Sequence, residues 1–328
     1  MRRRDVITLI GGAALAMSRI AHAQAMRRIV ILLTVAEQDL ATQGWVSVFR
    51  NRLTELGWVE GRNIRFELRW AASNPQRIQA NVAETMGSMP DLIVAQNTPM
   101  AVAIRKHSSS VPVVFVQVSD PVGDGIVTAL ARPGGNITGF TNTISTLGGK
   151  WLELLHDAAP RVSRVGFLYN KAVAPGGGSY YLEPFHAAAK SLSIDGVALE
   201  VGTTDEIEPA ITKFSQTGGN GIVTNSDAFI TVNRERIIAV ANRLLMPATY
   251  VNATFTHAGG LMSYGADTEQ QWLAAAGYVD RILRGEKPSN LPVQQPAKFV
   301  LSINLKTAKA INLDVPLFLQ QRADEVIE

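Results

Sequence analysis

The sequence predicts an α/β protein with two Rossmann-like lobes, each a doubly wound parallel sheet, joined by a hinge. From residue 28 onward, short runs rich in Val and Ile alternate with amphipathic stretches, which is the pattern of parallel strands with helical crossovers. Turn formers interrupt this alternation at 132–136 and 259–260, and a Pro-spaced segment follows at 287–296. The 328 residues exceed the size at which one core keeps growing. Two lobes with several crossings between them are therefore expected.

An export signal is expected at residues 1–23. Arg2-Arg3-Arg4 precedes a mostly apolar run from Val6 to Met17, which is too short to span a bilayer. Ala21-His22-Ala23 places small residues where a signal peptidase cleaves, so we expect cleavage after Ala23. The paired arginines also resemble a twin-arginine signal, although Val6-Ile7 stands where Phe-Leu is usual. Twin-arginine and general secretory export both stay open.

Charge and cysteine content narrow the function classes. The chain has 31 basic and 28 acidic residues, but four of the basic and one of the acidic residues lie in the expected leader, which leaves 27 of each sign. This balance does not support nucleic-acid binding, which needs a concentrated basic surface. The absence of cysteine excludes disulfides, thiolate chemistry and a lipid-bearing lipobox cysteine. We therefore expect a monomer without a membrane anchor, free in the periplasm.

The first lobe is predicted to start after the leader. Val46, Phe49, Leu53 and Leu56 recur at spacings of three and four, which places them on one face of a helix that stops at Gly57. Further helices are expected at 75–86 and 98–106. Strands are expected at 28–33, 64–70, 90–95, 113–118 and 137–141.

The second lobe repeats the pattern, beginning with a helix that carries Trp151, Leu154 and Leu155. Strands are expected at 162–169, 196–201, 221–224 and 248–251, and helices at 180–192, 207–217 and 232–245. An extended piece at 261–264, a helix through Trp272, a strand at 298–303 and a short helix complete the chain. We assign residues 26–141 and 260–290 to the first lobe, and residues 142–259 and 291–328 to the second.

Enzyme signatures are not found in the sequence. Gly176-Gly177-Gly178 follows a predicted strand but lacks the Gly-Lys-Ser/Thr ending of a phosphate-binding loop. The five histidines include no pair four residues apart, as a helical metal site would need. No Gly-x-Ser-x-Gly elbow is present. The sequence therefore indicates a protein that is not an enzyme and that needs no cofactor or metal.

Polar residues follow the predicted strands, where open α/β sheets bind ligands. They are Thr34, Asn97, Thr98, Gln117, Ser119, Asp120, Tyr169, Asn170, Asn225, Ser226 and Asp227. Thr98 before Pro99 either caps its own helix or leaves the helix N–H groups for a ligand carboxylate. Asp120 either starts a turn or balances a ligand ammonium, and Asp227 is its rival for that role. The pattern predicts a pocket for a small molecule.

Several segments, in order along the chain, resemble one protein family. They are Phe49-Arg50, 56–64 (LGWVEGRNI), 112–115 (PVVF), 119–123 (SDPVG), 132–139 (RPGGNITG), 260–265 (GLMSYG), 295–299 (QPAKF) and 303–308 (INLKTA). They resemble the ABC-transporter substrate-binding proteins that include tryptophan- and tyrosine-binding members. Asn97 departs from the Gly or Ser that precedes Thr-Pro in this family, so this segment does not itself imply an aromatic ligand.

The resemblance implies a type I periplasmic binding protein, which closes on an amino acid or related small solute and delivers it to an ABC permease and its ATPase. It implies binding residues in the loops that follow the strands. In this chain these are Thr34, Asn97, Thr98, Ser119, Asp120, Asn142, Tyr169, Ser226 and Asp227.

Other functions share this fold class. A periplasmic sensing module that docks on a membrane receptor has the same export signal and hinge. An exported enzyme is disfavoured because its motifs are absent. A cytoplasmic repressor needs a helix-turn-helix where the leader stands.

Overall fold

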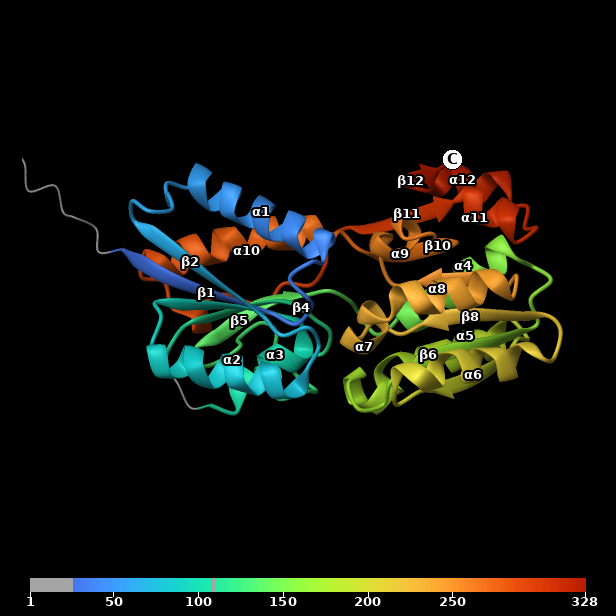
Figure 1. Ribbon diagram of the computed structural model, residues 1–328, viewed down its shortest axis with the longest axis horizontal. Helices are drawn as coiled ribbons and strands as arrows, with labels where there is room; N and C mark the ends of the chain where they lie inside the picture. Colours follow the sequence, from blue (N-terminus) through green and yellow to red (C-terminus); the bar gives the residue numbers. More distant parts are fainter. Residues whose placement is uncertain (1–25, 108–109) are drawn as a thin grey trace, which may run out of the picture.

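In a computed structural model, which describes residues 26–107 and 110–328, the chain forms two α/β lobes side by side (Figure 1). The expected leader, residues 1–23, lies outside the described residues. The first sheet has strand order β2-β1-β3-β4-β5, and the second has β12-β11-β10-β9-β8-β6-β7. All pairings are parallel except that of β10 with β11. Two sheets joined by helical crossovers confirm the predicted fold class.

The first sheet is apolar on both faces because helices cover both. Its strands are β1 (Arg27–Leu33), β2 (Ile64–Trp70), β3 (Leu92–Gln96), β4 (Val113–Val118) and β5 (Ile137–Thr141). One face packs against α1 (Leu40–Glu55) and α10 (Thr268–Leu283), and the other against α2 (Pro75–Ser88) and α3 (Asn97–Arg105) (Figure 1). Burial of both faces explains why β3 and β4 are continuous runs of buried residues rather than alternating ones.

The second sheet is longer. Its strands are β6 (Arg164–Tyr169), β7 (Asp195–Glu200), β8 (Asn220–Thr224), β9 (Ala248–Tyr250), β10 (Met262–Ala266), β11 (Phe299–Asn304) and β12 (Glu325–Ile327). Its helices are α4 (Leu147–Ala158), α5 (Ser179–Ser191), α6 (Thr204–Ser215), α7 (Ala228–Val232), α8 (Arg234–Arg243), α9 (Ala253–His257), α11 (Leu305–Ala310) and α12 (Leu317–Arg322). Short 3₁₀ turns lie at Pro175–Gly178 and Pro288–Asn290.

Several short elements of the second lobe differ from the predictions. The helix expected at 232–245 is α8, and the short helix α7, which precedes it and is separated from it at Asn233, was not predicted. Helix α9 and strand β12 were not predicted, because elements of five and three residues are shorter than the window in which periodicity is visible.

The chain crosses between the lobes later than the expected boundaries at 260 and 290. Strand β10 pairs with β9 and β11 in the second sheet, so the second crossing follows Ala266. Helix α10 then returns to the first lobe, where the ring of Trp272 lies 5.8 Å from that of Phe49. The chain stays there through Gln294, whose N–H donates to the carbonyl of Gly139 at 2.9 Å.

The crossings are tied together on the first-lobe side. The N–H of Thr141 donates to the carbonyl of Gln294 at 2.9 Å, which joins the first and third crossings. The side chain of Gln271, on α10 after the second crossing, donates to the carbonyl of Thr141 at 2.9 Å. The hinge is therefore a set of adjacent segments rather than separate linkers.

The packing of α10 on the first lobe makes a stability prediction. Trp272 is fully buried against Phe49, so Trp272→Ala removes a large apolar side chain and leaves a cavity. We expect its free energy of unfolding in urea to fall by about 3–5 kcal/mol. Leu317→Ala, at a side chain that is 66% exposed, should change it by less than about 0.5 kcal/mol. Equal effects of the two substitutions would contradict the assignment of α10 to the core of the first lobe.

Candidate ligand site between the lobes

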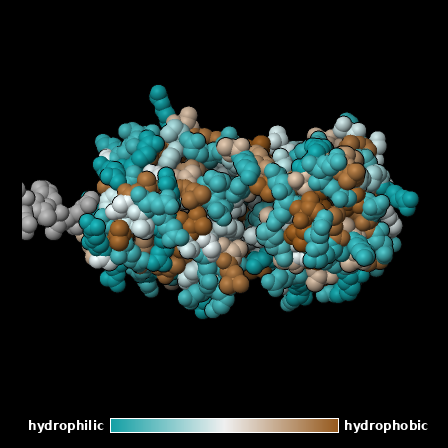
Figure 2. Space-filling view, turned by 90° about the horizontal axis from the view of Figure 1, so that it is seen from above, coloured by the Kyte–Doolittle hydropathy of each residue, from teal (hydrophilic) through white to brown (hydrophobic). Residues whose placement is uncertain are grey.

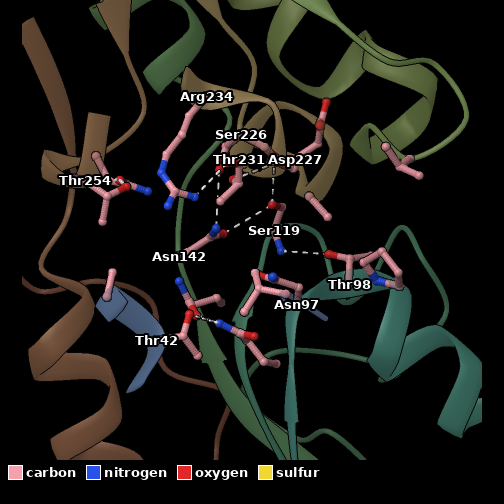
Figure 3. A pocket seen from close by; sticks show the side chains of 18 of the residues that line it. Thr42, Asn97, Thr98, Ser119, Asn142, Ser226, Asp227, Thr231, Arg234 and Thr254 are labelled. Atoms are coloured by element: carbon pink, nitrogen blue, oxygen red, sulfur yellow. Dashed lines mark hydrogen bonds between the residues drawn. The ribbon is translucent and has the colours of Figure 1, made fainter. Parts of the chain in front are cut away.

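A narrow pocket lies between the lobes, at the carboxyl ends of the parallel strands (Figure 3). In this arrangement the cavity volume is about 40 Å³, and the rest of the space between its walls is open to solvent. The first lobe contributes the segments after β1, β3 and β4, the second contributes those after β6, β8 and β9, and the crossing after β5 contributes Asn142. Figure 2 shows the hollow that separates the lobes on the face seen from above. Open α/β sheets bind ligands at this edge.

Six of the nine predicted site residues line this pocket, and together they come from both lobes. They are Asn97, Thr98, Ser119, Asn142, Ser226 and Asp227. Thr34, Asp120 and Tyr169 do not line it. Each of these three side chains makes other contacts that keep it out of the pocket.

Thr34 is buried behind the pocket wall, where its hydroxyl accepts a hydrogen bond from the amide of Asn97 at 2.7 Å. It therefore orients a lining residue instead of facing the cavity. Asp120 accepts a hydrogen bond from the N–H of Gly123 at 2.9 Å, so its carboxylate shapes a turn. The ring of Tyr169 lies against Gly178 within the second lobe, and its hydroxyl donates to Glu200 at 3.3 Å.

The predicted N-cap role of Thr98 is wrong. Helix α3 begins at Asn97, its N-cap is Gln96, and no side chain caps it. The Thr98 hydroxyl instead accepts a hydrogen bond from the N–H of Ser119 at 3.3 Å, which joins the loops after β3 and β4. Thr98 and Pro99 still line the pocket, but as part of this loop contact.

A chain of side-chain amides supports the first-lobe wall. The buried Gln96 donates to the side-chain oxygen of Gln117 at 3.0 Å and accepts from the N–H of Thr34 at 3.3 Å. Asn97 and Gln117 both have positive φ, 68° and 59°, a conformation that is unfavourable for residues other than glycine. Such backbone persists where the surroundings fix it, and it is common at functional sites. The wall is therefore held in place before any ligand arrives.

Asp227 is committed to its own lobe. Its carboxylate accepts hydrogen bonds from the N–H of Ile230 at 2.7 Å, which caps α7, and from the amide of Asn225 at 2.8 Å. The N–H of Asn170 adds a weaker third contact at 3.4 Å. These bonds favour the ionised form, but burial opposes it more strongly and raises the pKa of Asp227 to about 6. With both oxygens already used, Asp227 is a poor partner for a ligand ammonium.

The two lobes touch directly across the pocket. The Ser119 hydroxyl lies 3.3 Å from the carbonyl of Ser226 and 3.2 Å from the side-chain oxygen of Asn142. The amide of Asn142 donates to the Ser226 hydroxyl at 3.3 Å (Figure 3). An ion pair joins Arg234 of the second lobe to Asp39 of the first, with Nη2 and Oδ2 2.9 Å apart. The lobes therefore stand in a closed arrangement.

Several lining residues were not predicted, and they are Asp39, Thr42, Trp45, Gln96, Thr231, Arg234, Asn252 and Thr254. Asn252 follows β9, so the strand-end rule applied to that strand would have found it. Asp39 caps α1 through the N–H of Thr42, and an Asp before an apolar helix is a recognisable signal. Arg234 was missed because it lies on α8, beyond the loop that directly follows β8, where the strand-end rule does not reach.

None of the helices in residues 26–107 and 110–328 is long and apolar enough to cross a membrane. Within the same ranges, no group of three or more His, Asp or Glu residues is arranged to hold a metal ion.

Residues 30–327 match the family model of the ABC transporter substrate binding proteins, which confirms the resemblance seen in the sequence. The chain is 25% identical to a tyrosine-binding protein of Clostridioides difficile (strain R20291) over 276 residues, which is 84% of this chain and 77% of the relative.

Many solved structures share the fold, and two of them serve as examples. One is an ABC domain from Streptococcus pneumoniae in complex with L-Trp, with a TM-score of 0.84 and 21% identity over 92% of this chain and 100% of the other. The second is a ligand-free, open substrate-binding protein from Clostridium difficile, with a TM-score of 0.69 and 22% identity over 92% and 99%.

The burial of Asp227 predicts a pH-dependent loss of stability. Its pKa rises from an ordinary value of 3.8 to about 6 on folding, so between these values the folded chain holds a proton that the unfolded chain releases. Stability contributed by the protonated form is present below about pH 4 and is lost as the pH rises through about 6. Asp227→Asn has no ionisation there, and Asn is also a good N-cap.

We therefore expect the unfolding free energy of the wild type to fall relative to that of Asp227→Asn by about 2–3 kcal/mol between about pH 4 and pH 7, measured by urea denaturation. Asp314→Asn, at an exposed side chain, serves as the control, and its unfolding free energy should follow that of the wild type over this pH range. If the unfolding free energy of Asp227→Asn also followed that of the wild type across this pH range, burial of Asp227 would not be the cause of the pH dependence.

Proposed function

The chain belongs to the family of ABC transporter substrate-binding proteins, and we propose that it captures an amino acid between its lobes and delivers it to an ABC permease. The observation that carries this proposal is the convergence on one pocket of polar side chains from the segments that follow β1, β3, β4, β5, β8 and β9, which belong to both lobes. A hinge beside such a pocket is the device by which two-lobed proteins close on a ligand. The permease's ATPase supplies the energy for import, so the binding protein itself performs no chemistry.

The choice of an amino acid rests on relatives and on the pocket. One relative is named a tyrosine-binding protein, and a protein of the same fold was solved with L-Trp. Most residues that line the pocket are polar, which suits a charged headgroup, and Trp45 is the one aromatic side chain among its described lining residues. An amino acid with a ring or an apolar side chain has a packing surface there.

We place this activity in the periplasm, with the protein as an unanchored monomer. The expected leader at 1–23 supports export, and the absence of cysteine excludes the usual lipid anchor of exported binding proteins.

A ligand screen tests the proposal. The chain without residues 1–23 is heated with each of the common amino acids, and with dipeptides, nucleosides and sugars as comparison classes. A ligand at about one hundred times its Kd stabilises the folded state by about 2.7 kcal/mol, which corresponds to a melting-point rise of several degrees. We expect amino acids alone to give this rise, and calorimetric titration then gives their Kd. A shift with another class, or with no class at all, would overturn the proposal.

Trp45 gives a second test. If the solute's side chain packs on the indole, Trp45→Ala should weaken binding of aromatic amino acids by about 2- to 10-fold, since aromatic contacts contribute about 0.5–1.5 kcal/mol beyond area burial. Trp45→Phe keeps an aromatic face and should retain most of the affinity in the same titration. Unchanged affinity in Trp45→Ala would show that the solute's side chain lies elsewhere in the pocket.

A further inference from the structure

Three charged side chains line the pocket in the described part of the chain: Asp39, Asp227 and Arg234. Asp227 is occupied by hydrogen bonds from its own lobe. Asp39 and Arg234 come from opposite lobes and meet across the cleft at 2.9 Å, with only 11% and 19% of their side chains exposed. This pair of opposite charges is therefore what the two lobes jointly present to a solute.

Both members of the pair are held in position by their own lobes. Oδ1 of Asp39 accepts from the N–H of Thr42 as the N-cap of α1, which leaves Oδ2 for the cleft. Nη1 of Arg234 donates to the carbonyl of Thr231 at 3.1 Å, and Nη2 donates to Asp39. A guanidinium carries five N–H donors. Within residues 26–107 and 110–328, the other three N–H groups of Arg234 have no hydrogen-bond partner.

The chemistry of this pair selects among solutes. A largely buried charge is costly unless it is paired, so a solute with a single charge that displaced one member would leave the other without a partner. A zwitterion compensates both, because its carboxylate accepts from the guanidinium fork while its ammonium donates to the carboxylate of Asp39. Since the two partners lie on different lobes, one headgroup then ties both lobes together.

We propose that Asp39 and Arg234 are the specificity-determining pair of the pocket, with Arg234 binding the α-carboxylate and Asp39 the α-ammonium of the captured amino acid. This assignment rests on the proposed function, because it requires an amino acid as the solute. It deepens that function by naming the two groups that distinguish an amino acid from an amine or an acid with the same side chain.

The test compares three probes that differ only in the headgroup: L-tyrosine, tyramine, which lacks the carboxylate, and desaminotyrosine, which lacks the ammonium. If another amino acid gives the largest stabilisation in the screen, its own amine and acid analogues replace them. Calorimetric titration measures each Kd for the wild type, Asp39→Asn and Arg234→Gln. Asn is as good an N-cap as Asp, so Asp39→Asn preserves the start of α1.

We expect the wild type to prefer the amino acid over each analogue by about 10- to 100-fold, which is the effect of one charge-assisted hydrogen-bonding group. In Asp39→Asn, L-tyrosine should no longer bind more tightly than desaminotyrosine, but it should still bind more tightly than tyramine. Arg234→Gln should show the reverse. If the pair only held the lobes together, either substitution would weaken the binding of all three probes alike. Opposite losses in the two variants therefore indicate recognition of the headgroup.

Arg236→Gln is the matched control. Arg236 lies on the same helix, and its partner is the exposed Asp205 at 3.6 Å. It should keep both preferences, and melting curves confirm that each variant is folded. If the wild type binds the amino acid and both pocket variants keep its preferences, the pair is not the recognition element and the inference fails. If the wild type binds no amino acid, the proposed function fails, and the inference with it.

Discussion

The structure depends on the need to cover both faces of the first sheet. Strands β1, β3 and β4 are buried along almost their whole length, so each face requires a helical layer. The segment before residue 142 supplies α2 and α3 for one face, but for the other face it supplies only α1. Helix α10, which arrives after the second sheet has been built, completes that layer through Trp272. The chain must therefore cross between lobes three times, and the crossings form the hinge.

The same arrangement determines where polar groups gather. Parallel strands end at one edge of each sheet, and the two edges face each other, so backbone and side-chain polar groups are concentrated where the lobes meet. The first-lobe wall is stiffened by Gln96 and by two residues with positive φ, Asn97 and Gln117. The second-lobe wall is stiffened by Asp227. Rigid walls confine the motion of the protein to the hinge.

Much of the fold could be predicted from the sequence because its strands are buried on both faces and stand out as runs of Val, Ile and Leu. The site could be predicted only in part. Strand-end position selects Ser119 and Ser226, which line the pocket, but it does not say which side of the sheet a side chain occupies, and Tyr169 turns into its own lobe. The Asp39–Arg234 contact joins residues 195 positions apart, and no local pattern connects them.

Three adjacent crossings have a mechanical consequence. A twist of one lobe against the other would stretch the outer connections, and the hydrogen bonds between Thr141, Gln271 and Gln294 resist such shear. Bending about the line of the connections strains none of them. We therefore expect opening to follow nearly one degree of freedom. Little rotational entropy is then lost when the lobes close, so the free energy of contact with the solute goes mainly into affinity.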